Sequence, residues 1–182
     1  MAMRMPELLP VLDQKTIEKL IDETAKRIST DYAGRPLVLI GVLKGAFIFM
    51  ADLVRRLTIP VTIDFVGISS YGDQTVSSGC IRLTRDIGMD VCGRDVLIVE
   101  DIVDTGLTLA FLIAHIRSLG ASSVNVCALL DKRARRRVEV AVPYCCYEAP
   151  DEFLVGYGLD FDERYRQLPG VYRLQFNPEG AS

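Results

Sequence analysis

The sequence predicts an α/β fold: a twisted, mostly parallel sheet flanked by helices. Two observations lead to this prediction. Segments typical of strands and helices alternate over residues 37–130, which is the pattern of parallel strands joined by crossover helices. The runs at 37–42 and 95–99 are continuously apolar, as in strands buried on both faces of a sheet. With 182 residues, the chain is expected to form a single domain over 1–182.

The composition excludes several classes of protein. Apolar residues make up 49% and charged residues 25% of the chain, which excludes a disordered protein. No apolar run approaches the ~20 residues of a membrane span and no signal-peptide pattern opens the chain, so we expect no membrane partner. The net charge of −3 argues against an overall basic nucleic-acid binder, and the single histidine excludes an H-E-x-x-H zinc site.

The cysteines indicate the compartment. There are five, and none forms a C-x-x-C pair, so neither a disulfide framework nor a zinc site is predicted. A reducing cytoplasm is the expected location.

The elements of the first half follow from local patterns. Residues 1–12 are expected to form a loose leader. Asp13 is the predicted N-cap of a helix that runs to about Ser29, because the apolar residues behind it recur at helical spacing. Beyond the strand at 37–42 we expect a helix at 45–57, a strand at 61–69, a mobile loop at 70–80 and a returning strand at 81–86.

The second half continues the alternation. After the strand at 95–99 we expect a helix from about Thr105 to Leu119, which Gly120 ends. The remaining expected elements are strands at 124–130, 153–157 and 171–175, followed by a frayed tail at 177–182.

The clearest functional signal lies at the end of the strand 95–99. Glu100 and Asp101 follow it directly, where ligands bind in an open α/β sheet. The next segment, 104–108, is a tight turn with a glycine and two threonines that opens a helix, and such a turn suits a phosphate. The carboxylates can hold ribose hydroxyls or Mg²⁺, and Asp104 can move a proton. The alternative is that Asp104 only caps the helix and the acidic pair is solvated; the combination with the turn favours a functional site.

Residues 96–108 resemble the phosphoribosyl-pyrophosphate (PRPP) binding motif of type I phosphoribosyltransferases. Several further segments extend the resemblance over about residues 8–176. Within the type I family, the chain most resembles the bacterial hypoxanthine-guanine phosphoribosyltransferases. The resemblance implies a core over about 35–145, a small hood over about 146–176 with part of the N-terminus, and a flexible lid loop that begins at Ser70 and Tyr71.

The resemblance also implies how PRPP is bound. Lys44 and Gly45 match the pyrophosphate loop, in which the peptide before the lysine is cis in many members. Arg166 takes the place of an arginine near pyrophosphate, and Asp104 that of the general base. The implied PRPP and phosphate contacts are Lys44, Gly45, Glu100, Asp101, Asp104, Thr105, Gly106, Leu107, Thr108 and Arg166.

A second group of residues is implied for the purine. Lys132 would donate to the 6-oxo oxygen, which selects 6-oxopurines. Phe153 would stack on the base, and the backbone carbonyl of Leu154 would contact its exocyclic edge. Asp160 would contact the base edge and bind a second Mg²⁺ through water, so that the implied metal residues are Glu100, Asp101 and Asp160.

The reaction implied is Mg²⁺-dependent transfer of 5-phosphoribose from PRPP to N9 of hypoxanthine or guanine, which yields IMP or GMP and pyrophosphate. Two alternatives stay open: a phosphoribosyltransferase for xanthine or another base, and a regulator with the PRPP fold that binds nucleic acid through Arg133 and 135–137. For 135–137 a solvated basic edge is the expectation. The resemblance suggests a homodimer or homotetramer, and no nucleic-acid partner is expected.

Overall fold

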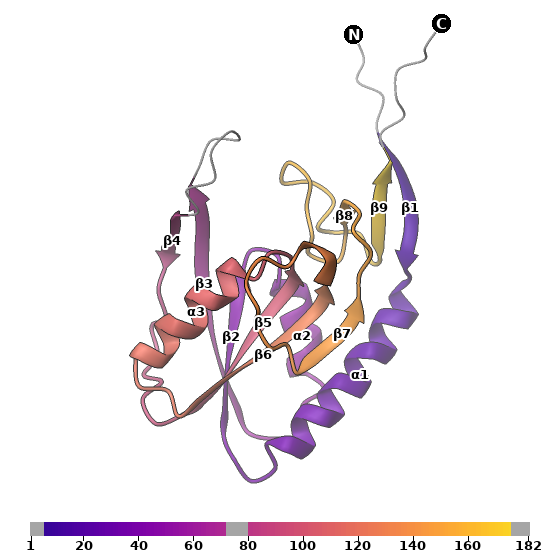
Figure 1. Cartoon of the computed structure of the whole chain (residues 1–182). Coiled ribbons are helices and arrows are strands. Elements are labelled where there is room, and N and C mark those ends of the chain that lie inside the picture. The colour runs from indigo at the N-terminus through magenta and orange to yellow at the C-terminus, as the bar shows by residue number, and fades with distance from the viewer. Residues whose placement is uncertain (1–5, 72–79, 176–182) are drawn as a thin grey trace, which may run out of the picture.

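The computed structural model describes residues 6–71 and 80–175, and a six-stranded sheet forms its centre (Figure 1). The strand order is β4-β3-β2-β5-β6-β7, and every neighbouring pair is parallel except β3 and β4. The predicted mostly parallel sheet is therefore confirmed. Its strands are β2 (Leu37–Leu43), β3 (Val61–Tyr71), β4 (Cys80–Arg85), β5 (Asp95–Val103), β6 (Ser123–Asp131) and β7 (Tyr144–Glu148).

Helices cover both faces of this sheet. Successive side chains of a strand point to opposite faces, so Leu37 and Leu39 of β2 pack in the core beneath α1 (Gln14–Asp31) and α2 (Phe47–Val54). Val38 and Ile40 pack in a second core beneath α3 (Leu107–Ser118). Figure 1 shows α3 on the opposite side of the sheet from α1 and α2. The continuous apolar runs thus have the burial on both faces that the sequence predicts.

The helices begin where local chemistry allows. The Asp13 side chain accepts a hydrogen bond from Thr16 N at 2.7 Å, which confirms the predicted N-cap. Helix α2 is shorter than the expected 45–57, because the residues before it form a turn. Helix α3 starts at Leu107 instead of Thr105, because Gly106 at its N-terminus has a φ of +83°.

A second, three-stranded sheet joins the two ends of the chain. It consists of β1 (Glu7–Leu12), β9 (Val171–Gln175) and β8 (Leu154–Val155), with β9 in the middle and antiparallel to both neighbours. Figure 1 shows β1 and β9 side by side. The expectation of a loose leader is wrong for 7–12, because these residues find their hydrogen-bond partners more than 150 positions away.

Several further boundaries differ from the expectation. Strand β7 was not predicted; it is a short edge strand that pairs with β6. The strand expected at 153–157 contains only two residues, since Gly156 has a φ of +93° and ends the pairing. Ser70 and Tyr71 belong to β3, where they pair with Ile81 and Cys80. The rest of the predicted lid loop, 72–79, and the tail from 177 lie outside the described residues.

No helix in the described parts of the chain is long and apolar enough to cross a membrane. The four cysteines whose side chains are described are free thiols: Cys92, Cys127, Cys145 and Cys146.

Candidate active site

The acidic pair lies at the carboxyl end of β5 and is buried. Glu100 and Asp101 are each 8% exposed, which overturns the alternative of a solvated pair. Asp101 Oδ1 accepts a hydrogen bond from Ile102 N at 2.9 Å, whereas Glu100 Oε2 has no partner among the described residues. Burial raises the pKa of both carboxyls, and the charge of Asp101 raises the pKa of Glu100 further. Two adjacent carboxyls held in this way favour binding of a cation or of hydroxyl donors.

The phosphate turn follows directly and opens α3. A Cβ at Gly106 would lie 2.4 Å from Val138 O, so the position accepts only glycine. Leu107 N donates to Thr105 Oγ1 at 3.4 Å, and Leu107 and Thr108 begin the first turn of the helix. The first N–H groups of a helix form an anion site, which agrees with the predicted phosphate turn.

Asp104 does not cap the helix, since Gly106 is the N-terminal residue and no side chain caps α3. Its Oδ2 lies 3.4 Å from Arg135 Nη1. Its Oδ1 is buried and has no hydrogen-bond partner in the described part of the chain. A carboxylate oxygen in this situation can accept a proton from a ligand.

The loop after β2 packs against the acidic pair. The peptide Leu43–Lys44 is cis. A Cβ at Gly45 would lie 1.8 Å from Asp101 Oδ2, and a Cβ at Gly158 would lie 2.1 Å from Gly45 O. Both glycines are therefore required for this close approach, which brings three segments of the chain to one place.

Charged side chains surround that loop. Lys44 Nζ lies 2.8 Å from Glu163 Oε2, and Arg166 Nη2 lies 2.8 Å from Asp160 Oδ1 and 3.5 Å from Glu163 Oε1. Arg166 Nη1 donates to Gly158 O at 2.8 Å, and its buried Nε has no partner within the described ranges. The structure thus brings Lys44, Arg166 and Asp160 together. Glu163 is not among the residues predicted from the sequence, in which the only signal for it is the acidic run around it.

Three of the predicted purine residues, Lys132, Phe153 and Leu154, lie at the end of β6 and at the start of β8. Lys132 is 5% exposed, and its Nζ donates to Glu152 O at 2.5 Å. Burial lowers the pKa of Lys132. Phe153 is 48% exposed, and its ring meets that of Phe161 edge to face, with ring centroids 5.4 Å apart. Leu154 buries its side chain in β8. An exposed aromatic ring beside a buried lysine is able to bind a planar base.

The basic run after Lys132 is a solvated edge at Arg135 and Arg137, as expected, but not at Arg136. Arg136 is only 9% exposed in its side chain and pairs with Asp131, which is 4% exposed. Arg135 pairs with Asp104 and with Asp151, at 3.4 and 3.7 Å. The expectation fails at Arg136 because the buried carboxylate of Asp131, the last residue of β6, attracts this cation, an effect that a charge count along the chain does not reveal.

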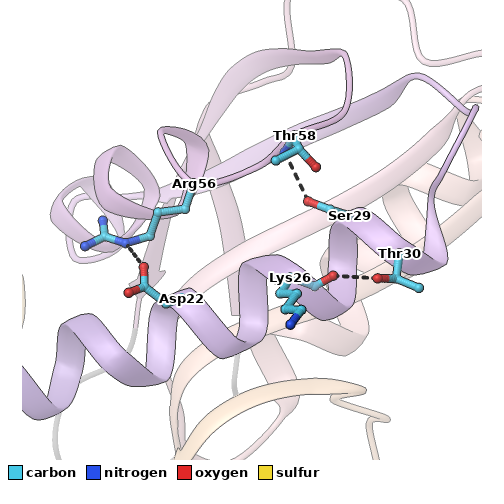
Figure 2. Close-up of a pocket in the computed structure, with 6 residues that line it drawn as sticks. All are labelled: Asp22, Lys26, Ser29, Thr30, Arg56 and Thr58. Carbon is cyan, nitrogen blue, oxygen red and sulfur yellow. Dashed lines mark hydrogen bonds and ion pairs between the residues drawn. The ribbon is translucent and has the colours of Figure 1, made fainter.

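A separate hollow of about 320 Å³ lies between α1 and the segment after α2. Figure 2 shows its six lining residues, with Arg56 paired to Asp22 and Thr58 N bonded to Ser29. None of the predicted site residues lines it. The candidate site lies instead at the carboxyl ends of β2, β5 and β6.

A parallel sheet with a carboxyl pair and a helix-opening phosphate turn at the end of one strand defines a class of proteins that bind sugar phosphates. The chain belongs to the phosphoribosyl transferase family, because the model of the phosphoribosyl transferase domain matches residues 10–162.

Relatives of known type support this assignment. The chain is 42% identical over 161 residues to a hypoxanthine-guanine phosphoribosyltransferase of Bacillus subtilis, a match that covers 88% of this chain and 89% of that protein. The crystal structure of a hypoxanthine-guanine phosphoribosyltransferase from Bacillus anthracis superposes with a TM-score of 0.88 at 40% identity, over 94% of this chain and 99% of the other. A bifunctional TilS/HprT protein of Listeria monocytogenes is 45% identical to this chain, and the match covers 88% of this chain. The same match covers only 25% of the Listeria protein, so this chain spans a quarter of its length.

Proposed function

We propose that this protein transfers 5-phosphoribose from PRPP to N9 of hypoxanthine or guanine, a purine-salvage reaction that releases pyrophosphate. The observation that carries the proposal is the close packing of Gly45 against Asp101, with the phosphate turn at the end of the same strand. The hypoxanthine-guanine phosphoribosyltransferases of Bacillus subtilis and Bacillus anthracis support it.

The proposed sites for PRPP follow the geometry. The turn 104–108 binds the 5-phosphate through its backbone N–H groups and threonine hydroxyls. Glu100 and Asp101 hold the ribose hydroxyls. Lys44 and Arg166 face the pyrophosphate, whose departure leaves positive charge on the ribose carbon. Holding the phosphate, the ribose and the leaving group at three fixed points orients the ribose carbon toward the base.

The carboxyl pair also fits Mg²⁺. Glu100 Oε2 has no partner in the described chain, and a nearby cation would favour the ionised form of a carboxyl whose pKa is raised. No group of three metal-ligating side chains occurs among the described residues. Mg²⁺ commonly uses one or two carboxylates together with phosphate oxygens and water. Bound there, the metal would neutralise charge on the pyrophosphate. Asp160 is the proposed second site, although its two oxygens contact Arg166 and Glu163 N.

The base binds on the other side of the ribose. Lys132 donates to the 6-oxo oxygen, Phe153 stacks on the ring and the carbonyl of Leu154 contacts the exocyclic edge. Asp104 accepts the proton that the base loses near N7, since one of its oxygens has no partner among the residues described. Ser70 and Tyr71, at the end of β3, are the proposed lid residues, whose role is to exclude water from the cationic ribose carbon. The protein acts in the cytoplasm as a homodimer or homotetramer.

The test is PRPP consumption with hypoxanthine, guanine and xanthine, with and without Mg²⁺. We expect turnover of the first two only in the presence of Mg²⁺. Preferred turnover of xanthine would support the alternative substrate, and no turnover with any 6-oxopurine would contradict the proposal. Binding of nucleic acid is not favoured, because Arg133, Arg135 and Arg136 all form ion pairs within the chain.

A further inference from the structure

The phosphate turn is supported by a neighbouring segment, 136–138. Thr105 O accepts hydrogen bonds from the N–H groups of Arg137 and Val138, at 2.9 and 3.1 Å. The position of a Cβ on Gly106 would be 2.4 Å from Val138 O and 3.1 Å from Arg136 Cδ. The turn therefore packs directly against this segment, and the segment restricts its conformation.

Arg136 is itself fixed by the end of the large sheet. Its Nη2 pairs with Oδ1 of Asp131, the last residue of β6, and both side chains are more than nine-tenths buried. Asp131 aligns with Val103 of β5, and Lys132 N donates to Val103 O at 2.9 Å. A buried ion pair keeps one geometry, because separating its charges is costly. The Asp131–Arg136 pair thus links the position of the turn to the ends of β5 and β6.

The second guanidinium nitrogen shows how Arg136 acts. Nη1 lies 3.4 Å from the Cβ position of Gly106, is out of reach of solvent, and has no acceptor in the described part of the chain. This nitrogen therefore faces the backbone of the turn at Gly106. Because Arg136 contacts the turn itself, its effect on a bound phosphate passes through the shape of the turn.

We propose that Arg136, held by Asp131, is a positioning residue that sets the turn 104–108 for the 5-phosphate. The inference rests on the proposed function. A lysine in place of Arg136 retains the charge but lacks the planar fork that contacts Asp131 and the turn together.

The test compares Arg136→Lys with the double variant Asp131→Asn/Arg136→Gln, which removes both buried charges and so leaves neither uncompensated. Arg117→Gln, a loss of exposed charge at the far end of α3, is the control. The measurements are the KM values for PRPP and for hypoxanthine, the affinities for GMP and guanosine by calorimetry, and the Tm. GMP and guanosine differ only in the 5-phosphate, so the ratio of their affinities reports on the turn.

Both variants are expected to raise the KM for PRPP and to reduce the preference for GMP over guanosine by about tenfold, since a 1 Å misplacement can cost up to ~10²-fold. Guanosine affinity and the KM for hypoxanthine are expected to stay within about twofold of the wild type, as are all values for Arg117→Gln. An unchanged ratio of the GMP and guanosine affinities, including equal losses of both, would overturn the inference. If the wild-type protein binds GMP no better than guanosine, both the proposed function and this inference are contradicted. If the wild-type protein prefers GMP and Arg136→Lys keeps that preference, only the inference is overturned.

Discussion

At the scale of single residues, Asp104 is the sharpest test of the chemistry. Its Oδ2 faces Arg135 and its Oδ1 has no partner within the described ranges. We expect Asp104→Asn to lower kcat by roughly 10²–10⁴-fold, because an amide does not accept the proton. The KM for PRPP should change little, since the backbone of the turn is kept. Steady-state kinetics measure both values, and wild-type turnover would rule out the proton-transfer role.

Glu163 affects the same site through its charge. Its carboxylate contacts Lys44 and Arg166, the two cations proposed to face pyrophosphate. The hydrogen bond from Lys44 is the largest of the effects that hold the pKa of Glu163 below its usual value. The carboxylate therefore competes with an incoming anion for both cations.

We expect Glu163→Gln to strengthen inhibition by pyrophosphate about two- to tenfold and to lower the KM for PRPP, because a neutral amide competes less for the two cations. Inhibition constants from initial rates measure the effect. The exposed Glu139, changed to Gln, is the matched control. Weaker inhibition by pyrophosphate in Glu163→Gln would show that the carboxylate helps to bind the ligand.

At the scale of elements, Asp64 ties β3 to the segment after β4. Its carboxylate accepts hydrogen bonds from Gly88 N at 2.7 Å, Met89 N at 3.1 Å and Arg85 Nη2 at 3.1 Å. Burial raises the pKa of Asp64, but the backbone donors and Arg85 together lower it by more, so the pKa lies below its usual value. The ionised form is thus favoured in the folded protein.

A lowered pKa in the folded state stabilises the protein above the unfolded pKa of about 3.9, and this stabilisation is lost as the pH falls toward the folded pKa. At pH 7 we expect Asp64→Asn to reduce the free energy of unfolding by about 1–3 kcal/mol, because buried donors lose acceptors. The difference from the wild type should shrink below about pH 4. Urea unfolding at pH 7 and pH 3.5 measures it, and the exposed Asp90→Asn is the control. A difference independent of pH would contradict the assigned charge.

At the scale of the whole molecule, the small sheet joins distant parts of the chain. Pairing of β1 with β9 covers the buried Leu12 and Val171, and β9 in turn pairs with β8, next to Phe153.

Removal of residues 1–12 should lower the Tm by at least about 4 °C, since one lost kcal/mol corresponds to ~2–8 °C in domains of 60–250 residues. It should also raise the KM for the base. Thermal unfolding and kinetics of this variant are compared with removal of 1–5 alone. Equal behaviour of the two truncated proteins would contradict a structural role for β1.

Much of the fold and site is predictable from local pattern. The apolar runs of β2 and β5 and the N-cap Asp13 depend on neighbours within a few positions, so sequence spacing indicates them directly. The acidic pair is predictable for the same reason, because a strand that ends in carboxylates places them at the sheet edge.

Contacts between distant segments were not predictable. Strand β1 was missed because its partner is β9, Arg136 because its partner is the buried Asp131, and Glu163 because it meets Lys44 across the sheet edge. The sequence by itself determined the parallel sheet, the turn that opens α3 and the acidic pair. Only the tertiary structure decided which cations are paired, which glycines permit close approach and where β1 and β9 meet. These features depend on packing between segments that are far apart in the sequence, and local periodicity does not reveal such contacts.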